Sequence, residues 1–265
     1  MKPNLIINGA AGRMGRRVLA LAIETGEFDI VGAIESSEHP AIGQDAGVVA
    51  GIGEINIKLD SGHPDTADVM IDFSLAKAVD GVIEYCVANN VGLVTGTTGL
   101  SAEQTKKVSE AARQIAIVRA SNMSVGMNVL FGLAVKAAVA LGDEYDIEIV
   151  EAHHRFKKDS PSGTAFTLAQ EIATETGRDW PSCLVHGRSG KDALRQKGTI
   201  GMHAVRAGDI VGEHSVILST LGETVTLSHR AHNRDNFVRG ALRAARWLIG
   251  KKAGLYSMAD VLGIR

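Results

Sequence analysis

The first half of the chain alternates short apolar runs with segments of helical period, and this alternation limits the fold more than any other feature. Helical segments are expected at 13–24, at 76–88 and after Ser101, where Gln104 stands at the spacing of a capping box. Such alternation is typical of a parallel sheet with helices on both faces. The sequence therefore predicts an α/β domain with a doubly wound parallel sheet. Its strands are expected at 5–8, 30–34, 69–73, 92–95 and 115–118.

The pattern changes near Val125. A long apolar helix is expected at 125–141 and a second helix from Gly163, with a polar loop at 179–198. This half predicts an α+β domain with a largely antiparallel sheet, and 265 residues are enough for about two domains. A helical stripe at 238–248 fits either domain. The strands are expected at 147–152, 199–205, 211–219 and 224–228, the last two joined by a hairpin turn at 221–223.

A glycine-rich turn joins the first expected strand to the first expected helix. Gly9, Gly12 and Gly15 follow the spacing G-x-x-G-x-x-G, a variant of the dinucleotide-binding fingerprint. A helix that begins there offers backbone N–H groups and its dipole to phosphates. Glu35 lies 20 residues after Gly15, at the end of the next strand, where an acidic residue accepts hydrogen bonds from ribose hydroxyls. This context favours dinucleotide binding over an ordinary glycine turn.

The residues after Glu35 bear on the choice of cofactor. Ser36 and Ser37 follow it, where an arginine would favour a 2′-phosphate. Since a carboxylate repels that phosphate, we expect NADH to be the favoured cofactor. Arg13 and Arg16 leave NADPH possible.

Two further segments stand at the ends of later strands, where an open α/β sheet binds its ligand. They are Gly96–Gly99 and Ala120–Ser124, and both contain small polar residues. Such residues can hydrogen-bond nicotinamide and ribose, but they are also good turn formers. The spacing alone leaves both interpretations open.

The densest polar cluster lies at residues 151–165. Its histidines and its cations Arg155, Lys157 and Lys158 stand in a chain of net charge −2, so they favour an anionic ligand. The segment 162–164 opens a helix, and N–H groups at a helix start can bind a carboxylate. Histidine titrates near neutral pH, and lysine can donate a proton. We favour a catalytic loop over the plainer alternative of a solvated charged loop.

Composition narrows the function further. Cys86 and Cys183 are the only cysteines, too few for a disulfide framework or a four-cysteine zinc site. Neighbouring His153 and His154 would point to opposite faces of a strand, so no metal is expected. A pI near 6.5 gives no indication of nucleic acid. The sequence shows neither a signal peptide nor an unbroken apolar run of about 18 residues, so we expect a soluble cytoplasmic protein with no membrane partner.

Over nearly its whole length, the sequence resembles the 4-hydroxy-tetrahydrodipicolinate reductases, also called dihydrodipicolinate reductases. The stretches His153–Arg155 and Arg206–Asp209 are highly specific for this family, whereas the glycine turn is not. The resemblance is carried by residues 9–15, 96–99, 151–155, 157, 162–165, 198–201 and 205–214.

The resemblance implies an oxidoreductase of diaminopimelate and lysine biosynthesis. In that family a hydroxylated cyclic dicarboxylate loses water, and NAD(P)H reduces its ring to give tetrahydrodipicolinate. The implied dinucleotide-binding Rossmann domain comprises residues 1–124 plus 234–265 and is completed by the C-terminal helix. The implied substrate-binding domain comprises residues 125–233, and its sheet builds a homotetramer. Because the glycine turn and the basic loop fall on different domains, we expect the domains to close over the substrate.

Functional residues are implied by the matching positions. His153 is implied as the proton donor and acceptor, Lys157 as a second proton donor, and His154, Gly163 and Thr164 as substrate-binding residues. Two positions depart from some relatives: Ser36 replaces an arginine, which puts a strong NADPH preference in doubt, and Met123 replaces an aromatic residue near the nicotinamide. The implied cofactor-binding residues are Gly9, Ala10, Ala11, Gly12, Arg13, Met14, Glu35, Gly96, Thr97, Thr98, Ala120, Ser121, Asn122 and Met123.

Two other functions stay open as alternatives. The first is another two-domain NAD(P)-dependent dehydrogenase of aspartate-derived substrates. A phosphorylating semialdehyde dehydrogenase would need a nucleophilic cysteine, and neither Cys86 nor Cys183 has an obvious base beside it. The second is an NADH-binding redox sensor, which would need a DNA- or partner-binding module that the sequence does not show.

Overall fold

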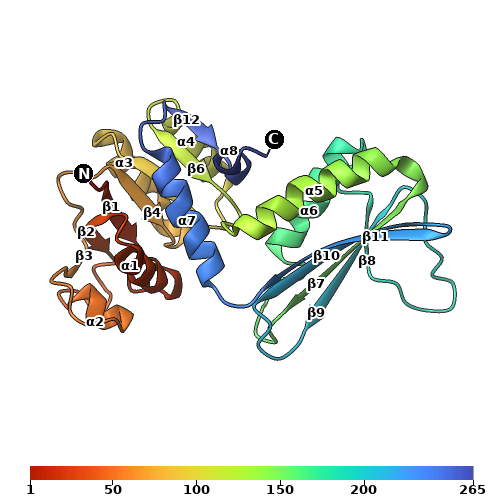
Figure 1. Ribbon diagram of the computed structural model, residues 1–265, viewed down its shortest axis with the longest axis horizontal. Helices are drawn as coiled ribbons and strands as arrows, with labels where there is room; N and C mark the ends of the chain where they lie inside the picture. Colours follow the sequence, from red (N-terminus) through yellow and green to blue (C-terminus); the bar gives the residue numbers. More distant parts are fainter. Residues whose placement is uncertain (265) are drawn as a thin grey trace. The chain divides into compact units, whose positions relative to one another are not determined.

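In the computed structural model, the structure describes residues 1–264, and these fall into two compact units (Figure 1). Unit 1 comprises residues 1–125 and 235–263. Unit 2 comprises residues 126–234 together with Ile264. The chain therefore leaves unit 1 once and returns to it for its last helices, so the helical stripe at 238–248 belongs to unit 1.

Within the described residues, unit 1 is built on a seven-stranded sheet whose strands are all parallel. Their order across the sheet is β12-β6-β5-β4-β1-β2-β3. The order reverses beside β1, and such a switch point is where an open α/β sheet binds its ligand. The strands are β1 (Asn4–Asn8), β2 (Asp29–Ile34), β3 (Leu59–Asp60), β4 (Val69–Asp72), β5 (Gly92–Thr95), β6 (Ala116–Arg119) and β12 (Gly254–Tyr256).

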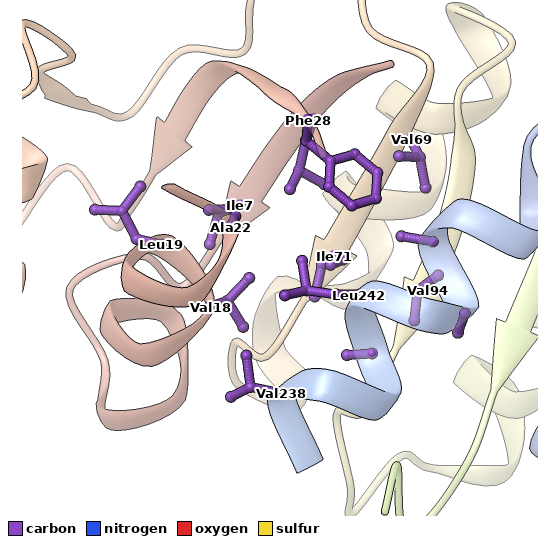
Figure 2. Close-up of a cluster of buried hydrophobic side chains, with 14 of the residues drawn as sticks. Ile7, Val18, Leu19, Ala22, Phe28, Val69, Ile71, Val94, Val238 and Leu242 are labelled. Carbon is purple, nitrogen blue, oxygen red and sulfur yellow. The ribbon is translucent and has the colours of Figure 1, made fainter. Parts of the chain in front are cut away.

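Helices cover both faces of this sheet. On one face, α1 (Arg13–Thr25) and α7 (Asp235–Leu248) pack on the strands, and Figure 2 shows Val18 of α1 and Leu242 of α7 in one apolar cluster. On the other face, α3 (Val79–Ala88) and α4 (Ala102–Ala111) enclose a second apolar cluster. Ser101 and Gln104 form the expected capping box at the start of α4. The doubly wound arrangement predicted from the alternating pattern is confirmed.

The C-terminal helix α7 lies directly against the residues that follow β6. A Cβ at Gly240 would stand 1.7 Å from the carbonyl oxygen of Met123, so only glycine allows this approach. Arg17 and Asp235 also join α1 to α7 through an ion pair of 2.8 Å. The remaining short elements of unit 1 are α2 (Ala46–Ala50), the 3₁₀ turn η1 (Ala76–Ala78) and α8 (Met258–Leu262).

Unit 2 has a mixed sheet, which corrects the expectation of a largely antiparallel one. Its strand order is β11-β10-β7-β9-β8 over the part of the chain described. Strand β10 pairs antiparallel with β7 and β11, but β9 pairs parallel with β7 and β8. Helix α6 (Gly163–Glu175) carries the chain from β7 across the sheet, and such a crossover produces parallel strands. The strands are β7 (Asp146–His153), β8 (Leu184–His186), β9 (Ile200–Arg206), β10 (Gly212–Thr220) and β11 (Glu223–Ala231).

Helix α5 (Val125–Leu141) packs beside α6 on one face of this sheet. With the 3₁₀ turn η2 (Gly142–Glu144) it forms, among residues 1–264, the one helix that is long and apolar enough to cross a membrane. Its side chains Met127, Leu130 and Phe131 are buried in the core of unit 2. A core helix of a globular protein passes the same test of length and composition, and 33% of the most apolar window of this helix is buried.

Strand β7 alternates between the two faces of the sheet. Ile147 and Ile149 point into the core beneath α5 and α6, and Glu151 and His153 follow them on the same side. Glu148 and its alternate neighbours point to the other face, where side chains are exposed or half-buried. One strand therefore carries a glutamate on each face of the sheet.

Candidate active site

The glycine turn lies between β1 and α1, as the fingerprint predicts. Gly9 has a positive φ of 73°, and Gly12 is the N-cap of α1. A Cβ at Gly15 would stand 2.1 Å from the carbonyl oxygen of Gly9, so the missing side chain lets the helix begin directly against the turn. The first N–H groups of α1 therefore face the turn, in the arrangement that binds phosphates at helix starts.

Glu35 follows β2 and contacts this turn. Its Oε2 accepts a hydrogen bond of 3.1 Å from the N–H of Ala11, and its Oε1 accepts one of 3.0 Å from the N–H of Ser36. The carboxylate predicted to bind ribose is thus held beside the turn predicted to bind phosphate. The two parts of the fingerprint form one site.

A cavity of about 820 Å³ opens at this point of unit 1. This volume lies within the ~300–1,000 Å³ of ordinary ligand sites. Three predicted residues, Gly9, Gly12 and Glu35, line it, whereas Ala10 and Ala11 of the turn and Arg13 and Met14 at the start of α1 do not. Its wall, glycine cradle and acidic residue fit a dinucleotide. The other lining residues are Asn8, Ser36, Ser37, Glu38, His39, Pro40, Ser61, His63, Phe73, Ser74, Leu75, Lys77, Ala78, Gly81 and Val82.

Most of these additional residues stand just after β2 and β4. Ser36, Ser37, Glu38 and His39 follow Glu35 in sequence, and Lys77 lies beyond the end of β4 in the 3₁₀ turn η1. The rule that ligands bind at the carboxyl ends of strands could have found them. On this ground, only the segments after β5 and β6 were predicted to bind the cofactor.

The predicted segment 96–98 is joined to the ends of β1 and β4 by hydrogen bonds to Asp72. Asp72 is 1% exposed, and its carboxylate accepts hydrogen bonds of 2.8 Å from Asn8 Nδ2 and 2.8 Å from Thr97 Oγ1. Thr95 Oγ1 donates to the same carboxylate over 3.1 Å. A Cβ at Gly96 would lie 2.4 Å from the ring of Phe73, which lines the cavity. Gly96 and Thr97 thus pack against its wall, and Thr98 is exposed.

The other predicted cofactor segment, residues 120–123, follows β6. Met123 is 2% exposed and lies in the core of unit 1. Asn122 Oδ1 accepts a hydrogen bond of 2.8 Å from the N–H of Ser124, so its side chain stabilises the turn. Ala120 packs against the same core, and Ser121 is exposed. This segment does not line the 820 Å³ cavity.

The histidine-rich segment of unit 2 begins at the end of β7. His153 is the last residue of the strand, 8% exposed, and its Nδ1 lies 2.6 Å from Glu151 Oε2. His154 follows outside the strand. Among residues 1–264 no group of three potential ligands could hold a metal ion.

Glu151 is fully buried and ionised. Its carboxylate accepts hydrogen bonds of 2.8 Å from both terminal nitrogens of Arg206 and one of 2.9 Å from the N–H of Ser162. Burial alone would raise the pKa of Glu151, but the hydrogen bonds from His153, Arg206 and Ser162 outweigh it and lower the pKa to about 2. The negative charge therefore persists throughout the physiological pH range.

A second histidine lies beside the first. The rings of His153 and His214 meet edge to face with centroids 5.2 Å apart, and His214 Nε2 lies 3.3 Å from Ser162 Oγ. Burial lowers the pKa of His214 to about 3, and the charge of His153 contributes. His214 is therefore neutral at physiological pH.

Helix α6 starts at the predicted anion site. Ser162 is its N-cap, and the Ser162 Oγ accepts a hydrogen bond of 3.2 Å from the N–H of Ala165, so Gly163 and Thr164 form the first turn. Lys157 Nζ lies 3.0 Å from the carboxylate of Asp159. Burial would raise the pKa of Asp159, but Lys157 and backbone N–H groups, that of Gly163 included, lower it. Lys157 and the start of α6 thus hold one carboxylate between them.

Unit 2 brings together His153, Lys157, Gly163 and Thr164, which the sequence analysis named, with three residues that it did not assign. Those three are Glu151, Arg206 and His214. Glu151 stands two residues before His153 on a predicted strand, and the period of two would have placed both on one face. Arg206 and His214 lie in the family-specific stretch 205–214 and had no assigned role.

Family models match nearly the whole chain. The model for the N-terminal part of dihydrodipicolinate reductase matches residues 3–123, and the model for its C-terminal part matches residues 126–262. The border between the two matches falls where unit 1 gives way to unit 2.

Curated relatives and solved structures agree with these matches. The 4-hydroxy-tetrahydrodipicolinate reductase of Syntrophotalea carbinolica is 46% identical over 262 residues, which cover 98% of each chain. The enzyme of the same name from Alkalilimnicola ehrlichii is 45% identical, with 100% of each chain covered. A dipicolinate-bound dihydrodipicolinate reductase from Paenisporosarcina sp. TG-14 has the same fold, with a TM-score of 0.76 at 22% identity over 98% of this chain and 99% of that one.

Proposed function

The chain belongs to the dihydrodipicolinate reductase family, and we propose that it reduces 4-hydroxy-tetrahydrodipicolinate to tetrahydrodipicolinate, with loss of water, in diaminopimelate and lysine synthesis. It is an oxidoreductase with an NAD(P)-binding Rossmann domain. We assign dinucleotide binding to residues 1–124 plus 234–265, and substrate binding to residues 125–233.

The observation that carries the substrate class is the carboxylate held at the start of α6. Lys157 Nζ lies 3.0 Å from the Asp159 carboxylate, and Gly163 and Thr164 form the first turn of α6 close by in the sequence, so this corner of unit 2 is suited to bind a carboxylate. In our proposal, a carboxylate of the cyclic dicarboxylate takes the place of Asp159. His154 and Thr164 contribute further contacts to the substrate.

His153 is the proton donor of the proposed reaction. Bound NAD(P)H supplies the hydride that reduces the ring. Hydride addition to a conjugated ring leaves an enamine-like carbon that needs a proton, and a positioned acid accelerates such a step by typically 10²–10⁴-fold. Glu151 holds the Nδ1 side of His153, which leaves Nε2 as the atom that gives up the proton. Lys157 is the second proton donor and pairs with the substrate carboxylate.

We propose that the cavity beside the glycine turn binds the cofactor and that NADH is favoured. Glu35 and Glu38 both line the cavity, and carboxylates accept ribose hydroxyls but repel a 2′-phosphate. Lys77, on the same wall, allows some use of NADPH. We expect kcat/KM for NADH to equal or exceed that for NADPH, and Ser36→Arg to raise the value for NADPH at least fivefold. A hundredfold preference of the unaltered enzyme for NADPH would refute this assignment.

We further propose a cytoplasmic homotetramer built through the sheet of unit 2. The sheet face opposite α5 and α6 carries Val150, Val205 and Ile217, and Val205 is 45% exposed. These apolar side chains stand on the same face as the ion pairs of Glu148, and they are suited to burial against a second copy of the chain. Light scattering should give the mass of four chains, and Ile217→Glu should lower it.

One assay tests the reaction itself. Hydroxytetrahydrodipicolinate, generated enzymatically, is mixed with the protein and NADH, and the loss of NADH absorbance is followed. We expect turnover that depends on both reactants. An absence of turnover with NADH and with NADPH would overturn the proposed reaction.

The same assay separates the two alternatives. Cys86 and Cys183 are both buried, and burial raises the pKa of each thiol, so neither is suited to be the nucleophile of a semialdehyde dehydrogenase. A redox sensor would bind NADH without turning it over.

A further inference from the structure

The carboxylate of Glu151 contacts three separate parts of unit 2. The role that we assign to it rests on the proposed function. Its Oε2 faces His153 on its own strand, its Oε1 accepts the N–H of Ser162 at the start of α6, and Arg206 of β9 bonds both oxygens. Glu151 is 0% exposed, so these contacts replace its hydration entirely. We propose that Glu151, held by Arg206, is a positioning residue that fixes the tautomer of His153 and joins the proton donor to the substrate-binding segments.

The tautomer follows from hydrogen-bond chemistry. A carboxylate oxygen can only accept, so the His153 Nδ1 that lies 2.6 Å from it must carry the hydrogen. When the imidazole gives up its proton it does so from Nε2, and the neutral ring remains in the Nδ1–H form. A buried carboxylate beside Nδ1 also stabilises the imidazolium before the transfer. This is the role of the aspartate in a serine protease triad.

The space around Nε2 is kept open by a glycine. A Cβ at Gly212 would stand only 3.2 Å from His153 Nε2. The charged and titratable groups nearest the ring are Glu151 on β7, Arg206 opposite it on β9, and the neutral His214 on β10. The family-specific stretch 205–214 therefore supplies the arginine, the open position and the neutral histidine around one imidazole.

Arg206 extends the arrangement to the lysine loop. Besides its bonds to Glu151, its Nη2 donates to the carbonyl oxygen of Asp159 over 2.7 Å, and the Asp159 carboxylate pairs with Lys157. Arg206 lies opposite His153 in the parallel register of β7 and β9. The strand pairing thus sets the distance between the two predicted proton donors through a single guanidinium.

Stability alone does not explain such a cluster. Taking a carboxylate and a guanidinium out of water has a desolvation cost that their attraction often fails to recover, and apolar replacements of buried ion pairs are commonly neutral or stabilising. What apolar residues could not do here is specify the proton position on His153 and the N–H direction of Ser162. A positioning role accounts for a charge in a core that could otherwise be apolar.

The test compares Glu151→Gln with Glu148→Gln, a change on the other face of the same strand. An amide at position 151 places an NH₂ group against the donors of Arg206 or Ser162, so it cannot hold all three partners. We expect kcat to fall ten- to hundredfold, while the Kd for NADH and the KM for the dicarboxylate change less than threefold. Glu148→Gln should keep kcat within twofold of the unaltered enzyme, and light scattering of this variant checks that the proposed contact between copies on the same face is kept.

A spectroscopic readout separates positioning from mere structure. With ¹⁵N-labelled histidine, the His153 signals, assigned by their loss in His153→Gln, should report the Nδ1–H form in the unaltered protein and in Glu148→Gln. In Glu151→Gln the Nε2–H form should become substantially populated. If Glu151→Gln keeps the wild-type kcat or the Nδ1–H form, the proposed role of Glu151 is overturned.

Two further arms keep the result decisive. If Glu151→Gln does not fold, Arg206→Lys takes its place, since an ammonium cannot bond both carboxylate oxygens and Asp159 at once; a kcat and tautomer equal to wild type would then overturn the proposal. If the unaltered protein shows no turnover, the proposed reaction fails, and the histidine signals still decide the role of Glu151.

Discussion

Strand β7 carries two glutamates on opposite faces of the sheet, and they have nearly the same chemistry. Glu151 is bonded by an arginine and a histidine at 2.6–2.8 Å, and Glu148 is bonded by two arginines and a histidine at 2.6–3.0 Å. In both, burial would raise the pKa of the carboxyl, and the hydrogen bonds outweigh it and lower the pKa to about 2. Charge and partners alone do not distinguish them.

The difference lies in what each carboxylate holds. Glu151 joins His153 to the start of α6, whereas Glu148 joins Arg188 and Arg195, from the segment between β8 and β9, to the sheet. A glycine stands beside each cluster: Gly212 near His153, the partner of Glu151, and Gly201 against Glu148 itself. A carboxylate with arginine and histidine partners is therefore no mark of catalysis, and the segments that it connects decide its role.

Replacing the histidine bonded to each glutamate should show the largest difference in kcat between the two faces of the sheet. His153→Gln removes the proposed proton donor, so we expect kcat to fall at least a hundredfold with little change in KM for the dicarboxylate. The matched control is His203→Gln, which removes the histidine bonded to Glu148 and should leave kcat within twofold. Steady-state NADH oxidation measures both. Equal losses in the two variants would erase the functional difference between the faces.

The two faces should also respond differently to acid. The pKa of His214 is lowered from 6.5 to about 3, so the unfolded chain binds a proton there that the folded protein does not. Its contribution to stability is therefore complete above pH 6.5 and is lost as pH falls towards 3, by about 2 kcal/mol between pH 6.5 and 5. The contribution of Glu148 is complete above pH 4.5 and is lost as pH falls towards 2.

Urea unfolding between pH 7.5 and 5 measures this difference. His214→Asn should flatten the pH dependence of the unfolding free energy in that range, and Glu148→Gln should leave its slope unchanged. If the unfolding free energy of His214→Asn depends on pH as steeply as that of the wild type, then His214 is not held neutral in the folded protein.

Local pattern predicted most of the fold. Helix α5 spans 125–141 and strand β5 spans 92–95, as the sequence analysis expected, because long periodic segments bury one face wherever they pack. The unpredicted strands are short: β3 has two residues, and β12 and β8 have three each. They form because a neighbouring strand offers hydrogen bonds, which no local period signals. The same limit explains the mixed sheet, since parallel pairing depends on the crossover through α6.

The family was predicted from its motifs, and the family models confirm it. The period of two along β7 could have placed Glu151 with His153. Arg206 could not have been found in this way, because it lies 55 residues from Glu151 and meets it only through the pairing of β7 with β9. The residues proposed to perform the chemistry were predicted from motifs, while those proposed to position them depend on the pairing of distant strands.

Gly201, beside Glu148 on the sheet face opposite α5 and α6, should affect the stability of the fold. A Cβ at Gly201 would stand 1.8 Å from Glu148 Oε2, so Gly201→Ala must push the carboxylate away from its arginines. We expect the unfolding free energy to fall by about 1–3 kcal/mol, as in other overpacked sites, with kcat within twofold of wild type. Thermal unfolding and the NADH assay measure the two quantities. An unchanged melting temperature would show that Glu148 moves without cost.

Gly212, beside His153 on the face covered by α5 and α6, should affect kcat, and this effect is expected to be the smallest of those predicted. A Cβ at Gly212 would lie 3.2 Å from His153 Nε2, close enough to displace the ring by a few tenths of an ångström but far enough to leave the strand intact. Gly212→Ala should therefore lower kcat about three- to tenfold, because proton transfer is sensitive to small misplacements, with a melting temperature near that of wild type. Gly201→Ala should have the opposite effect, with kcat unchanged and the unfolding free energy lowered. If both alanines change only stability, the open space at Nε2 is not the path of the proton.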